Sequence, residues 1–184
     1  MNVIPTELPD LLIIEPRIFG DQRGFFLETF QAARYASHGI HGPFVQDNFS
    51  RSARGVVRGL HLQNPKPQGK LVMVLRGRIL DVAVDVRAGS PTFGRHVAVE
   101  LSDENHRQIW VPRGFAHGFA VLSESADFLY KCDDLYRPSD EITVRWNDPA
   151  IGINWGIESP VLSQRDAAAP VLADIKGLPI YGSV

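Results

Sequence analysis

The sequence RGVVRGLHLQ, residues 54–63, lies about a third of the way along a chain of 184 residues. It places Arg54, Arg58 and His61 among apolar residues that favour a β-strand, with Gly55 and Gly59 between them. Charged side chains are costly to bury without partners, and a glycine inside a strand marks a bulge or a close approach to the backbone. The stretch therefore predicts a strand that holds an anion beside a titratable group, although an exposed, charged edge strand would give the same pattern.

The composition is that of a globular protein with one domain, residues 1–184, in which 44% of residues are hydrophobic and 22% are charged. The net charge of -2 gives no basic excess for nucleic acid, and no apolar run is long enough to cross a membrane. The N-terminus lacks a basic segment followed by an apolar one, and the single cysteine, Cys132, cannot form an intrachain disulfide. We therefore expect a cytoplasmic protein that binds neither nucleic acid nor membrane.

Thirteen prolines and sixteen glycines divide the chain into short pieces and leave few helix signals. Apolar runs and period-two alternation between turn residues predict further short strands at residues 11–15, 25–30, 44–50, 70–75, 79–86, 93–101, 108–111, 116–122, 126–132 and 142–146. Such a series is typical of an all-β sandwich or barrel. The turn at residues 76–78 predicts a hairpin between the strands on either side of it.

Short helices are expected at residues 31–38 and 164–169, and the Gly/Pro-rich tail, residues 150–184, is expected to wrap the surface. Alternation predicts which side chains share a face of a strand. In residues 44–50, one face carries Gln46, Asn48 and Ser50. In residues 79–86, the aliphatic side chains take one face, and the other carries Asp81, Ala83 and Asp85.

Two of the six histidines, His61 and His117, follow a glycine inside an apolar strand. Residues 112–117 match Pro-x-Gly-x-x-His, which resembles the second half of the cupin motif pair, and residues 55–61 resemble the start of the first half. This resemblance implies a cupin-type jelly-roll β-barrel in which the two segments meet. Metal-binding cupins use three histidines and a glutamate, but Gln63 replaces the second histidine and no acidic residue lies between it and Asp81. Two imidazoles alone make a poor metal site, so we expect neither a metal nor another cofactor.

The remaining polar side chains suit proton chemistry. His61 is a candidate general base near neutral pH. Tyr130 is either a phenolic acid or an aromatic residue lining the barrel, and Lys70 either stabilises an oxyanion or ends a strand in solvent. Candidates for a phosphate clamp are Arg23, Arg54 and Arg58, and Tyr136 could stack on a base. This set fits proton abstraction next to a carbonyl, on a substrate that carries a phosphate group.

The chain resembles the dTDP-4-dehydrorhamnose 3,5-epimerase family over nearly its whole length. The resemblance is carried by a series of motifs in family order and spacing, at residues 19–28, 44–50, 55–63, 68–72, 110–119, 130–132 and 162–166. It implies a cofactor-free isomerase that inverts C3 and C5 of dTDP-4-dehydro-6-deoxy-D-glucose by enolisation and opposite-face reprotonation. It also implies a homodimer that exchanges N-terminal strands between protomers.

The resemblance also implies the roles of individual residues. His61 would remove the protons, Asp166 would orient it, Tyr130 would return a proton from the opposite face, and Lys70 would stabilise the enolate. Substrate contacts would come from Arg23, Glu28, Gln46, Asp47, Asn48, Arg58, Lys70, His117, Tyr136, Glu141 and Arg165. The family commonly has lysine where this chain has Arg165, which keeps the charge and changes the donor geometry.

Four other functions remain open at this point: a single-site epimerase, a 3,4-ketoisomerase, a metal-dependent cupin oxygenase and a non-catalytic binding protein. One geometric question is also open. Side chains alternate along a regular strand, so Arg58 and His61 would point to opposite faces. We expect a bulge or twist at Gly59 that lets both serve one site, or contacts made from different ends of a bent strand.

Overall fold

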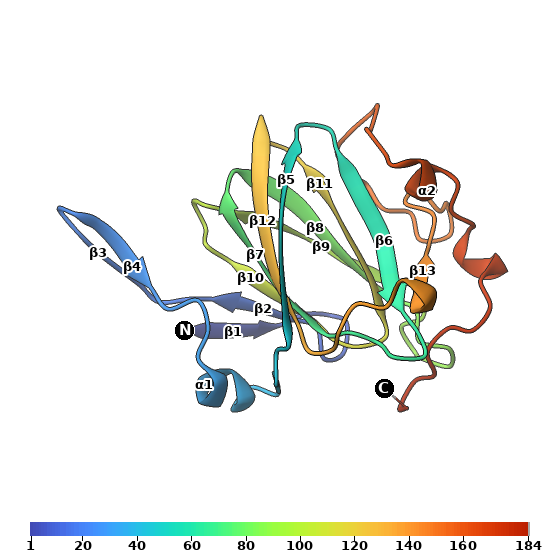
Figure 1. The fold of residues 1–184 in the computed structure, drawn as a ribbon, viewed down its shortest axis with the longest axis horizontal. Coiled ribbons are helices and arrows are strands. Elements are labelled where there is room, and N and C mark those ends of the chain that lie inside the picture. Colours follow the sequence, from blue (N-terminus) through green and yellow to red (C-terminus); the bar gives the residue numbers. More distant parts are fainter. Residues whose placement is uncertain (184) are drawn as a thin grey trace.

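Two facing antiparallel sheets form the body of the protein, as seen in a computed structural model that describes residues 1–183 (Figure 1). The six-stranded sheet has the order β1 (Asn2–Pro5), β2 (Leu12–Glu15), β10 (Gln108–Val111), β7 (Lys70–Arg76), β12 (Ser125–Cys132) and β5 (Gln46–Ala53). The five-stranded sheet has the order β13 (Glu141–Thr143), β6 (Val57–Gln63), β11 (Phe115–Val121), β8 (Arg78–Asp85) and β9 (His96–Ser102). This arrangement confirms the all-β jelly roll expected from the sequence.

The helices are short, as the scarcity of helix signals predicted. They are α1 (Ala32–Ala36), α2 (Gln164–Ala167) and the 3-10 turns Pro138–Asp140 and Leu172–Asp174. Helix α1 is shorter than expected at both ends: it begins after Gln31, whose side chain caps it by accepting a hydrogen bond from the Arg34 amide at 2.6 Å, and it ends at Ala36. No helix in residues 1–183 is both long and apolar enough to cross a membrane.

The apolar residues form two main layers, one on each side of the five-stranded sheet. Between the sheets, Val72, Ile109 and Phe128 pack with inward-facing residues of β8 and β11. On the outer face, the aliphatic side of β8 is covered by Ile151 and Trp155 from the tail. The tail therefore contributes buried apolar surface, and both faces of β8 are out of water.

The expected hairpin across residues 76–78 is wrong. Strand β7 pairs with β10 and β12, whereas β8 pairs with β11 and β9, so the turn carries the chain from one sheet to the other. Gly77 makes this corner with φ +81°, and a Cβ there would collide with the carbonyl oxygen of Ser125. Alternation predicts strands but does not say which sheet each joins.

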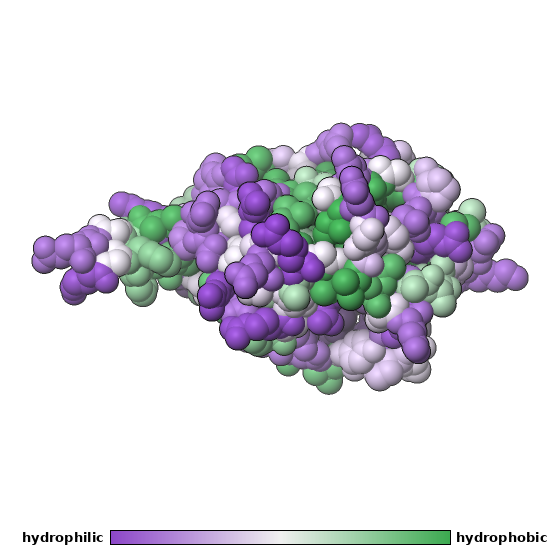
Figure 2. Space-filling model, turned by 90° about the horizontal axis from the view of Figure 1, so that it is seen from above, coloured by the Kyte–Doolittle hydropathy of each residue, from purple (hydrophilic) through white to green (hydrophobic). Residues whose placement is uncertain are grey.

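Strands β3 (Ile18–Asp21) and β4 (Gly24–Leu27) form a hairpin that extends away from the barrel (Figure 1). The sequence predicted only its second strand, with a later end at residue 30. Four large apolar side chains on the hairpin are 45–68% exposed, namely Ile18, Phe19, Phe25 and Phe26. Figure 2 shows the same projection, with apolar atoms between its hydrophilic tip and the body.

Candidate active site

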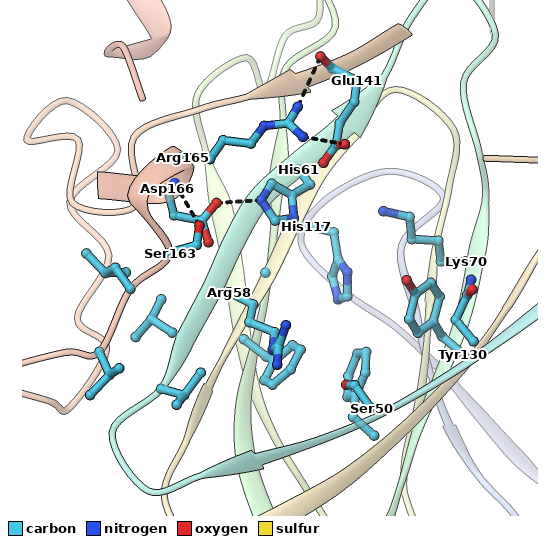
Figure 3. Close-up of a pocket in the computed structure, with 18 of the residues that line it drawn as sticks. Ser50, Arg58, His61, Lys70, His117, Tyr130, Glu141, Ser163, Arg165 and Asp166 are labelled. Carbon is cyan, nitrogen blue, oxygen red and sulfur yellow. Dashed lines mark hydrogen bonds and ion pairs between the residues drawn. The ribbon is translucent and has the colours of Figure 1, made fainter. Parts of the chain in front are cut away.

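A cavity of about 600 Å³ lies between the two sheets and receives side chains from both (Figure 3). His61, Arg58 and His117 come from the five-stranded sheet, whereas Lys70, Tyr130 and Asn48 come from the six-stranded sheet. The tail adds Ser163, Arg165 and Asp166, and β13 adds Glu141. The structure therefore gathers most of the predicted site residues around one space. A smaller lobe of about 320 Å³ shares several of these residues and adds Gln46 and Tyr136.

The His61 imidazole is bonded to the Asp166 carboxylate, with Nε2 and Oδ1 2.6 Å apart. Because a carboxylate accepts, Nε2 carries the hydrogen and Nδ1 keeps its lone pair for a proton. Burial favours a raised pKa for Asp166, but hydrogen bonds from His61, from Ser163 and from the Gly59 backbone hold this pKa below its ordinary value. The pair is a histidine base with an ionised orienting partner.

The tail brings Asp166 to His61 on β6, although the two residues are 105 positions apart in the sequence. Val161 forms a parallel bridge with Val56, and the Val57 amide donates to the Val161 carbonyl oxygen at 3.0 Å. Ser163 then caps α2 by accepting from the Asp166 amide at 3.0 Å. These local bonds set the direction of the carboxylate, which is 3% exposed.

Lys70 and Tyr130 stand on the opposite wall from His61, as Figure 3 shows. They lie on β7 and β12, which are neighbours in the six-stranded sheet. Burial raises the pKa of the Tyr130 phenol to about 12, so the hydroxyl keeps its proton at neutral pH. Burial also lowers the pKa of Lys70, since a desolvated ammonium is less stable than one in water. A proton donor and a cation thus face the histidine across the cavity.

A bulge at Gly59 lets Arg58 and His61 share the cavity, which confirms the first of the two expected geometries. On β11, His117 and Phe119 are two positions apart, yet they pair with His61 and Arg58, which are three apart. Gly59 has φ +121°, a conformation that side-chain-bearing residues rarely adopt. The Arg58 guanidinium is held by its Nε, which donates to Ser52 Oγ at 3.0 Å.

Asp81 is a site residue that the sequence analysis did not assign. Its carboxylate is fully buried and contacts His117 Nε2 at 2.9 and 3.0 Å. The available signal was its place in β8: Asp81 and Asp85 share one face, and the aliphatic face opposite is covered by the tail. The carboxylate face of β8 therefore points into the barrel, the reverse of the usual expectation.

At the mouth of the cavity, Glu141 joins two other predicted substrate contacts. Its Oε2 accepts from Arg165 Nη1 at 2.6 Å and from the Tyr136 hydroxyl. On β5, Gln46 Nε2 donates to Asn48 Oδ1 at 3.0 Å. Gln46 and Asn48 share one face of β5, as the alternation predicted, and the structure shows that it is the inner face, whereas their neighbour Phe49 is 58% exposed.

Four predicted residues do not reach the cavity within one chain. Asp47 points outward and pairs with Lys131 Nζ at 2.9 Å, because it occupies the outer face of β5. Arg23 lies in the turn of the projecting hairpin, paired with Asp21, and Glu28 pairs with Arg34 Nη1 at 2.7 Å. Arg54 precedes β6 and is not among the residues that line the cavity. Their contacts with substrate stay predictions.

The two histidines of the cupin-like motifs are cross-strand neighbours, as the resemblance to cupins implied. Each is engaged with a carboxylate, His61 with Asp166 and His117 with Asp81. Across residues 1–183, no three His, Cys, Asp or Glu side chains are grouped so that they could hold a metal ion. The arrangement of the site is that of an acid–base cavity.

The facing sheets and the cavity between them define a cupin-type jelly-roll protein with an acid–base site. The family model described as dTDP-4-dehydrorhamnose 3,5-epimerase matches residues 5–174. The chain belongs to this family.

Individual relatives agree with the family match. The protein of that name from Salmonella typhimurium is 54% identical over 175 residues, which cover 94% of this chain and 96% of the relative. The crystal structure of dTDP-6-deoxy-D-glucose-3,5-epimerase from Legionella pneumophila, in complex with dTDP-4-keto-L-rhamnose, matches with a TM-score of 0.96 and 56% identity over 98% of both chains. A 3'-monoepimerase from Streptomyces bikiniensis, in complex with dTDP-quinovose, matches with a TM-score of 0.90 and 37% identity over 96% of this chain and 92% of that one.

Proposed function

We propose that this protein inverts C3 and C5 of dTDP-4-dehydro-6-deoxy-D-glucose, giving dTDP-4-dehydro-L-rhamnose. The observation that carries the proposal is the opposed pair of walls: His61 with Asp166 on one side, and Tyr130 with Lys70 on the other. Inversion at carbon needs a base on one face and an acid on the other, and this cavity offers both. The family match supports the same reaction.

In the first half of each inversion, His61 Nδ1 takes a proton from the carbon next to the 4-keto group. The electron pair moves to the keto oxygen, and the enolate charge is stabilised by the Lys70 ammonium. C3 and C5 both adjoin C4, so one lysine serves both rounds. Asp166 stabilises the imidazolium that forms and fixes the ring orientation.

In the second half, the Tyr130 hydroxyl gives its proton to the same carbon from the opposite face. The carbonyl reforms and the configuration is inverted. Because burial raises the pKa of Tyr130 to about 12, the phenol arrives protonated and regains its proton readily from solvent after each round. The proton taken by His61 returns to solvent, so atoms and charge balance over the cycle.

The remaining lining residues are suited to holding the nucleotide part of the substrate. The Arg58 guanidinium, oriented by Ser52, faces the cavity and is placed for a diphosphate oxygen. Arg165 is available for the same group when it leaves Glu141. Tyr136 stands beside the smaller lobe with Gln46, where a flat base can stack on its ring.

We further propose that Arg23 and Glu28 act in the site of a second copy of the chain. Both lie on or next to the projecting hairpin, whose exposed phenylalanines suit burial against a partner. A homodimer with exchanged N-terminal segments would complete both sites in this way. The single thiol, Cys132, is in keeping with the reducing cytoplasm, where we place the enzyme.

The test is incubation of the protein with dTDP-4-dehydro-6-deoxy-D-glucose in deuterated water, followed by NMR. Deuterium at both C3 and C5, together with product of the L-rhamno configuration, is the expected result. Exchange at neither carbon would remove the epimerase proposal.

A single-site epimerase is the second candidate, because a 3'-monoepimerase shares this fold at a TM-score of 0.90. The same experiment separates the two functions. Deuterium at one carbon alone, with the other configuration retained, would replace the double epimerase by a single-site enzyme.

A further inference from the structure

Gln63 occupies the position where metal-binding cupins have their second histidine, and its amide is fully used in another way. The side chain is 3% exposed. Its Nε2 donates to the carbonyl oxygens of Lys66 at 2.5 Å and Leu135 at 3.2 Å, and its Oε1 accepts from the Arg137 amide at 2.7 Å. Gln63 therefore bonds the backbone on both sides of Tyr136.

Two more glutamines bond the same stretch, residues 134–137, which we call the Tyr136 segment. Gln46 Oε1 accepts from the Tyr136 amide at 2.9 Å, and Gln68 Nε2 donates to the Asp134 carbonyl oxygen at 2.7 Å. Four successive residues are thus held by three amide side chains that come from β5, from β6 and from the residues before β7. Amides that bond backbone atoms fix a loop as strand pairing fixes a strand.

The Tyr136 segment is a wall of the smaller lobe of the site. The three glutamines line this lobe together with Tyr136, and the Tyr136 hydroxyl donates to Glu141 on β13. Backbone and ring are therefore anchored separately, by Gln63 and Gln46 on one side and by Glu141 on the other. A ligand that stacks on this ring meets a surface already in place and does not have to order it.

We propose that Gln63 is a positioning residue for nucleotide recognition: it fixes the Tyr136 segment so that the tyrosine ring stands ready for the ligand's base. The inference rests on the proposed function, in which Tyr136 contacts the base. Gln63 acts through the tyrosine and touches neither the sugar nor the reacting carbons.

The substitution Gln63→Glu tests this role because it hardly changes the shape of the side chain. A carboxylate still accepts from the Arg137 amide but cannot donate to the carbonyl oxygens of Lys66 and Leu135. We expect dTDP to bind about tenfold more weakly, since two hydrogen bonds are lost. Pyrophosphate, which lacks a base, should bind as it does to the unmodified protein. For the reaction, KM should rise about tenfold while kcat changes less than about threefold.

Coupling to Tyr136 separates positioning from a general effect on stability. Tyr136→Ala should also weaken dTDP binding, and adding Gln63→Glu to it should cause little further loss. The same affinities are measured for Gln63→Met, which removes the amide without burying a charge and so keeps the test valid if Gln63→Glu does not fold. The matched control is Asn105→Asp, because the Asn105 amide also bonds three backbone groups, here two N–H groups that it accepts from and one carbonyl that it donates to, in a turn outside the cavity. It should leave the ratio of dTDP to pyrophosphate affinity unchanged.

The outcomes are distinguishable. Equal weakening of dTDP and pyrophosphate by both Gln63 variants, or losses that simply multiply with Tyr136→Ala, would overturn the positioning role. If Tyr136→Ala weakens dTDP binding and both Gln63 variants do not, the inference fails while the proposed function stands. If Tyr136→Ala itself has no effect on dTDP binding, the proposed base contact fails, and the inference fails with it.

Discussion

The substitution Gly59→Ala should disable the site more than it destabilises the fold. A Cβ on residue 59 would lie 2.6 Å from the Gly118 Cα and 2.8 Å from the His117 carbonyl oxygen, both backbone atoms of β11. Ordinary contacts begin at 3.4 Å, so β6 and β11 must part by about 0.8 Å at the bulge. Backbone at φ +121° adds strain of roughly 1–3 kcal/mol for a residue with a side chain.

The displaced strand carries both Arg58 and His61, and His61 is bonded to Asp166. A misplacement of about 1 Å can cost roughly 100-fold in rate, so we expect kcat/KM to fall by about that factor or more. The melting temperature should fall by only about 2–12 °C, because each kcal/mol is worth roughly 2–4 °C in a chain of this length. Epimerisation is followed by NMR and unfolding by circular dichroism.

Gly89→Ala is the matched control, since Gly89 has φ +83° and no atom within 4 Å of the added Cβ. It should lower the melting temperature modestly and leave kcat/KM within about twofold. The reasoning would be refuted by a Gly59→Ala variant that keeps a third or more of the activity, or by an equal loss of activity in both variants.

Two further variants separate charge from packing. Asp166→Asn should lower kcat by about 10²–10⁴-fold. In the unmodified protein the ionised Asp166 contributes stability above pH 3.8, and this contribution is lost as the pH falls through the lowered pKa of Asp166. The variant should lack this pH-dependent stability, and acid unfolding that is the same in both proteins would contradict the prediction. Lys70→Met should lower kcat by about 10²–10³-fold yet raise the melting temperature at neutral pH, because burial of the ammonium lowers the pKa of Lys70. The unmodified protein should gain stability as the pH rises from that lowered pKa towards 10.5, because the unfolded chain still binds the Lys70 proton that the folded protein has released. The variant should show no such gain, and melting curves across this pH range test the prediction.

The sequence predicted those parts of the structure that depend on local pattern. Alternation located β5 and placed Gln46 and Asn48 on the same face of it, and the need for Arg58 and His61 to serve one site indicated the bulge at Gly59. It could not decide which sheet each strand joins, so the turn at Gly77 was misassigned as a hairpin. Sheet partners depend on contacts distant in sequence, which a period-two pattern does not encode.

The site shows the same limit. Side-chain chemistry indicated His61 as a base and left Lys70 and Tyr130 as candidates, and the family resemblance then implied their roles. Asp166 was paired with His61 only through that resemblance, because the two residues are 105 positions apart. Asp81 was missed because the outer face of β8 is covered by a tail whose packing no strand pattern reveals. The available signal was the position of Asp81 and Asp85 on one face of β8, a strand whose other face is aliphatic.

The central claim is that His61 and Tyr130 act on opposite faces of the sugar, and Tyr130→Phe tests it most directly. The variant keeps the aromatic ring and loses the proton donor. In deuterated water, the proton that His61 removes exchanges with solvent, and His61 returns a deuteron to the same face of the sugar. Deuterium should therefore enter C3 or C5 at a rate close to that of the unmodified protein, while the rate of formation of inverted product falls by about 100-fold or more. Equal loss of exchange and inversion would contradict the opposed roles of the two residues.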